Sequence, residues 1–309
     1  MMNTLRIATR KSPLALWQAE HVASLLQDKF PDLDIALRPM STQGDKLLDA
    51  PLAKVGGKGL FIKELEQALL TGDADIAVHS LKDVPMEIPD GLAMPVFLAR
   101  GDPHDALVCD HHDSLASLPA GTRVGTTSLR RRCQLLAARP DLRVVTIRGS
   151  VHTRLAKLDA GECDALLLAV AGLRRLGLGE RVREVISPEV ILPAVGQGVL
   201  SIECRQGDEG AESLIATLND ADSAACVSAE RAMNQKLGGG CQVPIAGFAE
   251  LDGEELALRA LVASIDGARV LRANGRAPRG EGALLGASVA DDLLSQGAGA
   301  ILAEVYADG

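Results

Sequence analysis

Residues 72–80 read GDADIAVHS, and residues 161–170 read GECDALLLAV. Each stretch joins the acidic turn that ends a helix to a mostly apolar strand. Upstream, LRIATRKSPLALW at 5–17 and TRVGTTSLRRRCQLL at 122–136 both read as strand, serine or threonine cap and helix. Apolar strands that alternate with helices are typical of a parallel or mixed sheet covered on both faces. The sequence therefore predicts two similar α/β domains, which commonly bind ligands in the crevice between them, at the carboxyl ends of their strands.

The pattern changes after residue 205. SAACVSAERAMNQKL at 223–237 reads as a helix, and Asp-Gly turns at 252–253 and 266–267 then punctuate alternating strands. A helix from about Leu284 to Ser295 and a last strand, AILAEVY at 300–306, are expected to follow. These elements predict a small α+β domain with an antiparallel sheet.

Bulk composition indicates a globular protein of two or three domains, since the chain has 309 residues and is 47% hydrophobic. Its six cysteines form no Cys-x-x-Cys pair, which favours free thiols in a reducing compartment. The pair His111-His112 lacks a second set of ligands, so no metal site is predicted. No apolar run has the length of a signal peptide core or a membrane span, and we expect a cytoplasmic protein.

Charge is distributed unevenly along the chain. The net charge is −9, yet residues 121–160 carry nine Lys and Arg against two aspartates. This segment predicts a specific anion site, although a solvated helix face explains any single arginine equally well.

Two residues stand out as candidates for chemistry. Cys241 follows three glycines in KLGGGCQVPIAG at 236–247, a run that leaves one sulfur open to a bulky group. Asp83 follows a strand closely and precedes a Val-Pro step, although its surroundings alone favour an ordinary turn aspartate. His79, in the strand before it, is better interpreted as a packing residue than as a base.

Six motifs together resemble the porphobilinogen deaminase family and span nearly the whole chain. They are ATRKSPLALWQA (8–19), PLAKVGGKGLF (51–61), DIAVHSLKDVP (75–85), GTTSLRRRCQL (125–135), LPAVGQG (192–198) and GGGCQVPIA (238–246). The resemblance implies an enzyme that joins four porphobilinogen molecules head to tail, releasing ammonia, on a dipyrromethane cofactor bound to Cys241 through a thioether. A soft thiolate readily captures the electrophilic methylene that such a pyrrole forms.

The resemblance also implies the architecture. We expect two doubly wound α/β domains with mixed sheets, similar to periplasmic binding proteins, and a third small α+β domain that carries the cofactor cysteine. The expected boundaries are 1–99 with 200–217 for the first domain, 100–199 for the second and 218–309 for the third. The family suggests a monomer that binds a small-molecule substrate.

Residue roles carry over from the family's motifs. Asp83 becomes the catalytic carboxylate, which reverses the interpretation from its surroundings alone. The expected cofactor-binding residues are Cys241, Lys82, Asp83, Ser128, Arg130 and Arg131. The expected substrate-binding residues are Arg10, Ser12, Lys54, Lys58, Arg148, Arg154, Arg175 and Gln197. Guanidinium forks suit the acetate and propionate that each pyrrole carries.

One motif departs from the family, and two other functions compete. Where the family commonly has asparagine after Arg-Gly, this chain has Ser150, and His152 follows two residues later. A non-enzymatic binder of small anions would use similar domains. Nucleic-acid binding through Arg130, Arg131 and Arg132 is disfavoured, because the net charge is acidic. Trp17 and Tyr306 are also the only Trp and Tyr residues in the sequence, so few side chains could stack on bases.

Overall fold

The computed structural model describes residues 3–46, 62–240 and 243–307. The chain forms two compact units, Met1–Gly101 with Val199–Ala224 and Asp102–Gly198 with Ala225–Gly309. Within the described ranges, every helix is too short or too polar to cross a membrane.

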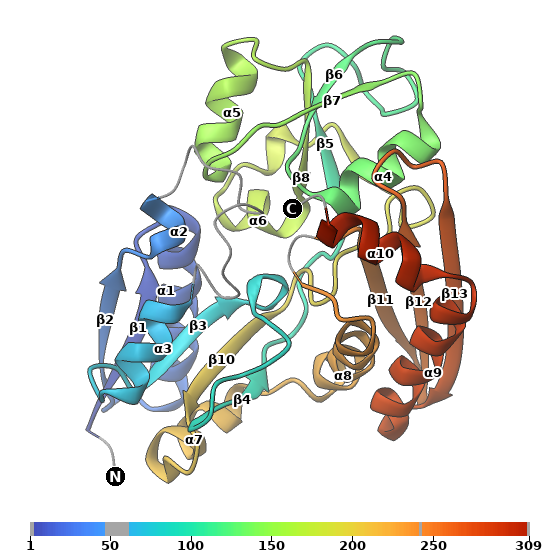
Figure 1. Ribbon diagram of the computed structural model, residues 1–309. Helices are drawn as coiled ribbons and strands as arrows, with labels where there is room; N and C mark the ends of the chain where they lie inside the picture. Colours follow the sequence, from blue (N-terminus) through green and yellow to red (C-terminus); the bar gives the residue numbers. More distant parts are fainter. Residues whose placement is uncertain (1–2, 47–61, 241–242, 308–309) are drawn as a thin grey trace. The chain divides into compact units, whose positions relative to one another are not determined.

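A five-stranded mixed sheet forms the centre of the first unit (Figure 1). Its strand order is β2-β1-β3-β10-β4; β2, β1 and β3 are parallel, and β10 is antiparallel to both β3 and β4. The strands are β1 (Thr4–Arg10), β2 (Asp34–Met40), β3 (Ile76–Ser80), β4 (Leu92–Phe97) and β10 (Leu200–Arg205). The helical elements are α1 (Pro13–Lys29), α2 (Gln43–Lys46), α3 (Lys63–Leu70), η1 (Leu81–Asp83), α7 (Glu209–Ile215) and η3 (Ala216–Leu218).

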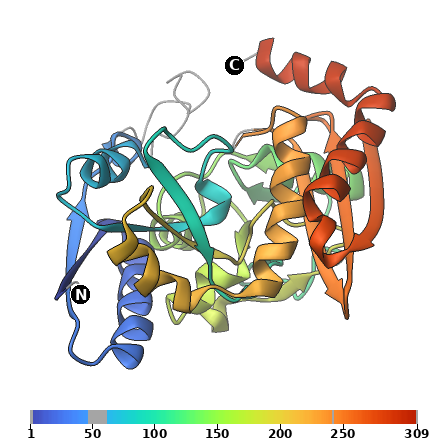
Figure 2. The same ribbon diagram turned by 90° about the horizontal axis from the view of Figure 1, so that it is seen from below.

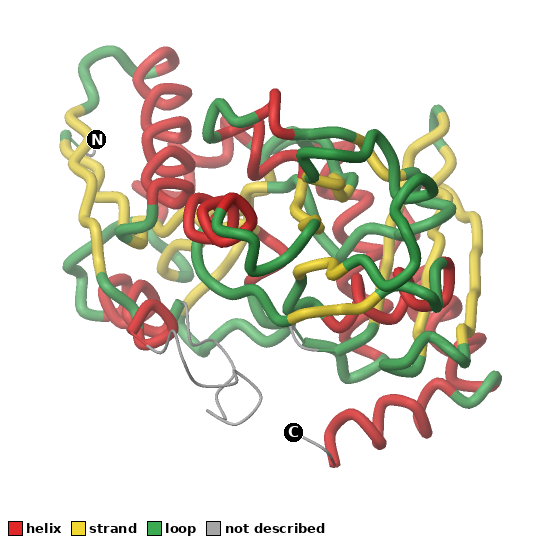
Figure 3. Tube along the Cα trace, turned by 90° about the horizontal axis from the view of Figure 1, so that it is seen from above, coloured by secondary structure: helices red, strands yellow, loops and turns green. Residues whose placement is uncertain are grey.

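Helices cover both faces of this sheet. Ile7 of β1 packs in one apolar core with Val22 of α1. Its neighbour Ala8 packs in a separate core with Leu65 of α3. Because successive strand residues point to opposite faces, α1 and α3 lie on opposite sides of the sheet. Figure 3 shows α1 running beside the strands near the N-terminus.

The second unit contains another mixed sheet, with the order β7-β6-β8-β5-β9. Here β7, β6 and β8 are parallel, and β5 is antiparallel to both β8 and β9. The strands are β5 (Asp105–Val108), β6 (Arg123–Gly125), β7 (Arg143–Val145), β8 (Ala165–Ala169) and β9 (Glu184–Ile186). The helical elements are α4 (Leu129–Ala138), α5 (Val151–Asp159), α6 (Val170–Arg175) and η2 (Gly179–Arg181).

The two mixed sheets repeat one construction. Each has three parallel strands, then a strand antiparallel to both of its neighbours. The turn before the third parallel strand also recurs, with Gly72 and Gly161 at φ 77° and 75°. The prediction of two similar α/β domains with mixed sheets is confirmed.

The C-terminal part of the chain contains a three-stranded antiparallel sheet, in the order β11-β12-β13. Its strands are β11 (Ile245–Asp252), β12 (Glu255–Ala263) and β13 (Val270–Pro278), and its helical elements are α8 (Ala221–Lys236), η4 (Arg279–Glu281), α9 (Gly282–Ser295) and α10 (Ala298–Ala307). Figure 2 shows α8 and α9 side by side. Met233 of α8, Val289 of α9 and Leu258 of β12 share one apolar core. The predicted α+β region is confirmed, while the three domain boundaries stay a prediction.

One predicted strand is wrong, because residues 298–307 form the helix α10. Ala298, Ile301 and Leu302 are its buried residues, at the three- and four-residue spacing of a helix face. The apolar content of AILAEVY could not distinguish a strand from a helix, since a short apolar run fits both.

Candidate active site

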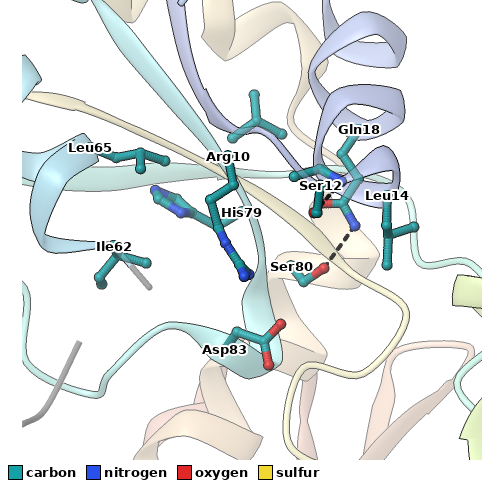
Figure 4. Close-up of a pocket in the computed structure, with 11 residues that line it drawn as sticks. Arg10, Ser12, Leu14, Gln18, Ile62, Leu65, His79, Ser80 and Asp83 are labelled. Carbon is teal, nitrogen blue, oxygen red and sulfur yellow. Dashed lines mark hydrogen bonds between the residues drawn. The ribbon is translucent and has the colours of Figure 1, made fainter. Parts of the chain in front are cut away.

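A pocket in the first unit brings together three predicted site residues (Figure 4). Arg10 ends β1, Ser12 precedes α1, and Asp83 ends η1; all three line the pocket. β1 and β3 are parallel neighbours, so their carboxyl ends meet at one edge of the sheet. The order of the strands therefore explains why residues about seventy positions apart converge.

Local interactions fix the backbone around this pocket. Ser12 is the N-cap of α1, and its Oγ accepts a hydrogen bond from the Ala15 N–H at 3.3 Å, with Pro13 in the first turn. Gln18, one turn further on, is buried and donates to Ser80 Oγ at 2.8 Å (Figure 4). This contact joins α1 to the end of β3, directly before the turn that carries Asp83.

The turn η1 holds two predicted residues in different environments. Asp83 is exposed and lines the pocket, whereas Lys82 is half-buried and is not among the lining residues. The Val84 N–H donates to Leu81 O at 3.0 Å, which closes the turn. The structure thus places Asp83, rather than its neighbour, at the pocket.

His79 also lines the pocket, on β3. Its ring is buried, and Nε2 lies 2.9 Å from Oε2 of Glu203 on β10. Glu66 of α3 is buried as well; burial raises the pKa of its carboxyl, and the nearby charge of Glu203 raises it further. Sequence reasoning missed both glutamates, because no motif links positions so far apart in the chain.

A second group of predicted residues surrounds Asp105 in the other unit. Arg130 and Arg131, in the first turn of α4, each place Nη2 2.7 Å from one of the Asp105 carboxylate oxygens. Gln197 donates to Asp105 Oδ1 at 3.0 Å and to Pro103 O at 2.5 Å. All four of these side chains are buried.

Charge balance explains how these four polar side chains can be buried together. Burial opposes ionisation of Asp105, but the two guanidinium groups outweigh it and hold the pKa of Asp105 well below its usual range. Burial lowers the pKa of Arg130, against the attraction of Asp105. Backbone carbonyls satisfy further donors, since Arg130 donates to Leu192 O and Arg131 to Leu167 O. Asp105 is a further residue that the sequence did not indicate.

The predicted anion-binding residues around α4 and α5 lie at the N-termini of these helices. Ser128 is the N-cap of α4 and accepts from the Arg131 N–H, while Ser150 caps α5 by accepting from the Thr153 N–H at 3.2 Å. The departure from the family at Ser150 thus preserves a good N-cap. Arg154 donates through Nε to Gly149 O at 2.9 Å, and Arg148 is half-buried just before the cap.

Arg175 ends α6 and donates through Nη2 to Gly198 O at 2.7 Å. Burial lowers the pKa of this guanidinium to about 10, so it stays charged at neutral pH.

Cys241, Lys54 and Lys58 lie outside the described residues. The other five cysteines are buried, and Cys109, Cys133, Cys163 and Cys204 are free thiols. Among the described residues, no group of three His, Cys, Asp or Glu side chains is arranged to hold a metal ion.

The excess of basic residues in 121–160 is partly neutralised from outside that segment. Asp105 pairs with two of its arginines, and Asp164 pairs with Arg123 at 2.7 Å. Within the segment, Arg139 pairs with Asp141 at 2.6 Å. Counting charges along the sequence therefore overstates how much positive charge this segment offers to a ligand.

Comparison with known families identifies the class of protein. Residues 5–213 match the family model described as "Porphobilinogen deaminase, dipyromethane cofactor binding domain", and residues 224–295 match "Porphobilinogen deaminase, C-terminal domain". The chain therefore belongs to the porphobilinogen deaminase family. It is a transferase of tetrapyrrole biosynthesis that uses a dipyrromethane cofactor and polymerises porphobilinogen, as the six sequence motifs predicted.

Solved structures with a low similarity to this chain include two binding proteins. The aliphatic sulphonate binding protein SsuA of Escherichia coli is 16% identical, with a TM-score of 0.42 over 76% of this chain and 70% of that one. A putative methionine-binding lipoprotein of Bacillus subtilis is 14% identical, with a TM-score of 0.44 over 70% of this chain and 90% of that one. TM-scores this low carry no argument about what this chain binds.

Proposed function

We propose that Asp83 is the catalytic carboxylate and that the pocket it lines holds the reacting pyrrole. One observation carries this proposal. Among the described residues that line the pocket, Asp83 is the one acidic side chain, and the pocket also includes Arg10 and Ser12. Positive charge develops on the pyrrole nitrogen as ammonia leaves and again as the carbon–carbon bond forms. A fixed carboxylate beside that nitrogen stabilises both transition states.

We propose further that Cys241 binds the dipyrromethane through a thioether and that Lys82, Asp83, Ser128, Arg130 and Arg131 contact it. When bound, this cofactor supplies the pyrrole carbon to which the first substrate molecule is joined. Its two rings carry four carboxylates in all, and the residues present suit such an anion. Arg130 and Arg131 share the single carboxylate of Asp105 at the N-terminus of α4, which leaves a positive region there.

The remaining predicted contacts would bind the acetate and propionate groups of porphobilinogen. They are Arg10, Ser12, Lys54, Lys58, Arg148, Arg154, Arg175 and Gln197. Each charge-assisted contact contributes about 1.5 to 3 kcal/mol when desolvated. Gln197 also donates to Asp105 through its amide, which fixes the position of the Gln197 side chain.

The test of the catalytic assignment is Asp83→Asn. This variant is expected to fold and to lose nearly all turnover, while intact mass of the denatured protein still shows the addition of two pyrroles mapped to Cys241. Asp90→Asn, an exposed acid in the same unit, is the matched control and should keep full activity. Near-normal turnover of Asp83→Asn would refute the role of Asp83, and an unmodified Cys241 thiol in active protein would refute the tether.

We also propose a cytoplasmic monomer that binds porphobilinogen and no nucleic acid. Arg130 and Arg131 both pair with Asp105, so only Arg132 of the arginine triplet is exposed, which supports the exclusion of nucleic acid. The buried free thiols of Cys109, Cys133, Cys163 and Cys204 support a reducing compartment. Light scattering during gel filtration tests the monomer, and a binding titration with single-stranded DNA at low salt tests the nucleic-acid assignment.

A further inference from the structure

Three titratable side chains form a buried cluster behind the Asp83 pocket. The His79 and Glu203 side chains are 4% and 1% exposed, and their Nε2 and Oε2 atoms are 2.9 Å apart. β3 and β10 are antiparallel, with Ser201 opposite His79 and Glu203 opposite Ala77. These four residues share one face of the sheet, since residues two apart on a strand point the same way. Glu66 of α3 is buried on this face, within reach of the charges of both His79 and Glu203.

This cluster is costly for a purely structural feature. Glu203 Oε1 and Ser201 Oγ are buried, with no hydrogen-bond partner among the described residues. Leaving such an atom unsatisfied is costly, because the polar group has lost its hydrogen bonds to water without replacing them. Burial raises the pKa of the Glu66 carboxyl, which lies within reach of the charges of the His79–Glu203 pair. Buried polar atoms that lack a hydrogen-bond partner, and carboxyl groups whose pKa values are shifted, are concentrated at functional sites.

His79 lines the pocket (Figure 4). Because it also bonds to Glu203, it connects the cluster to the pocket. The family's reaction releases a proton in every cycle. The carbon–nitrogen bond of the aminomethyl group, in its ammonium form, breaks and ammonia leaves with the bonding pair. A carbon–carbon bond then forms to a pyrrole α carbon, and that carbon loses its proton. Each addition therefore yields one ammonia and one proton.

Asp83 is poorly suited both to stabilise the cationic pyrrole and to accept the proton that the reaction releases. Its proposed role requires the carboxylate to stay ionised beside the cationic pyrrole, and taking the proton would neutralise it. A neutral imidazole is the better acceptor near neutral pH, and a carboxylate on its other side stabilises the imidazolium that forms.

We propose that His79 accepts the proton released at each carbon–carbon bond formation, with Glu203 as the counter-ion that orients its ring. The inference rests on the proposed function, which places the reacting pyrrole in this pocket. His79 then passes the proton to solvent, which restores the neutral ring. The charged groups facing His79 are Arg10 from β1, Glu203 from β10 and Glu66 from α3, and Asp83 lines the same pocket from η1.

The first test does not depend on enzymatic activity. NMR titration of the histidine ring nitrogens is carried out on the whole protein, with His79→Gln used to assign the His79 signals among the six histidines. The His79 ring is expected to titrate reversibly and to protonate at lower pH in Glu203→Gln, because the counter-ion has been removed. His111→Gln, at an exposed position, is the control and should leave the His79 titration unchanged. The proposal is overturned if the His79 ring does not titrate, or if it protonates at the same pH in Glu203→Gln as in the wild type.

The second test is the pH profile of turnover. Glutamine can keep a donor at the position of Nε2 but cannot accept the proton. His79→Gln is therefore expected to lower turnover at least roughly 100-fold, the usual contribution of a general base, and to abolish the limb of the profile that reports the histidine. In Glu203→Gln that limb should move to lower pH. A wild-type profile in both variants overturns the proposal.

Different results would refute the proposed role of Asp83 and the inference about His79. Both His79→Gln and Glu203→Gln should still carry the two-pyrrole addition at Cys241, as shown by intact mass. If Asp83→Asn is active, the proposed function is wrong whatever His79 does. If Asp83→Asn is inactive while His79→Gln turns over at the wild-type rate, only the inference about His79 is wrong.

Discussion

Arg6 binds Asp75 through a two-point guanidinium contact, with Nε 3.0 Å from Oδ2 and Nη2 2.6 Å from Oδ1. The same guanidinium donates to Gly72 O, so the contact ties the start of β1 to the turn before β3. The second unit repeats the arrangement, since Arg123 contacts both oxygens of Asp164, at 3.2 and 2.7 Å, and donates to Gly161 O. Both halves of the repeat therefore place an arginine of a parallel strand against the same turn, and in the first unit Arg205 of β10 contacts Asp75 as well, at 3.3 Å.

The two copies of this contact should differ in their effect on stability. The Asp75 side chain is 4% exposed and the Asp164 side chain 44%. Asp75→Asn is expected to lower the free energy of unfolding by about 1–3 kcal/mol, because it leaves guanidinium donors of Arg6 and Arg205 without their charged acceptor. Asp164→Asn should cost clearly less, because water screens that pair. Urea unfolding of both variants measures the difference, and equal losses would contradict the argument from burial.

Asp105 is expected to matter more to stability than any other acid in its unit. Asp105→Asn leaves two buried guanidinium groups without a carboxylate, at a cost of about 3–5 kcal/mol. The pKa of Asp105 is lowered from 3.8, so its stabilisation is fully present above that pH and is lost only as pH falls through the lower folded value. Chemical denaturation at pH 7 tests the substitution, with the exposed Asp113→Asn as control. A loss below about 1 kcal/mol would be inconsistent with the buried network.

Most of the fold could be predicted from local sequence, because the turn and strand at 72–80 recur at 161–170, and the strand, cap and helix at 5–17 recur at 122–136. The site was only partly predictable. Asp83 and Arg10 belong to motifs, whereas Asp105 meets Arg131 across 26 positions and Gln197 across 92. His79 and Glu203 are 124 positions apart and meet because β10 returns beside β3. Such partners depend on strand order, which local patterns do not specify.

Glu66→Gln should stabilise the protein increasingly as pH rises. Burial raises the pKa of Glu66 above 4.5, so the folded state holds its proton more tightly than the unfolded state does. Ionising Glu66 therefore destabilises the fold as pH climbs from about 4.5 through the raised folded value, and glutamine avoids this loss. The gain in Tm over wild type should be larger at pH 8 than at pH 5. Glu20→Gln, at an exposed position, is the control, and a gain that shrinks at higher pH would reverse the assignment.

The contact between α8 and α9 depends on Gly286. A Cβ added there would lie 2.2 Å from Ala229 O and 2.8 Å from Met233 N, both backbone atoms that cannot rotate away. Gly286→Ala is therefore expected to destabilise the protein by about 1–3 kcal/mol, although alanine alone favours a helix by about 1 kcal/mol. Gly299→Ala in α10 meets nothing closer than 3.9 Å and should be neutral or slightly stabilising. Thermal unfolding of the pair separates helix propensity from packing, and a stabilised Gly286→Ala would show that the two helices can move apart at little cost.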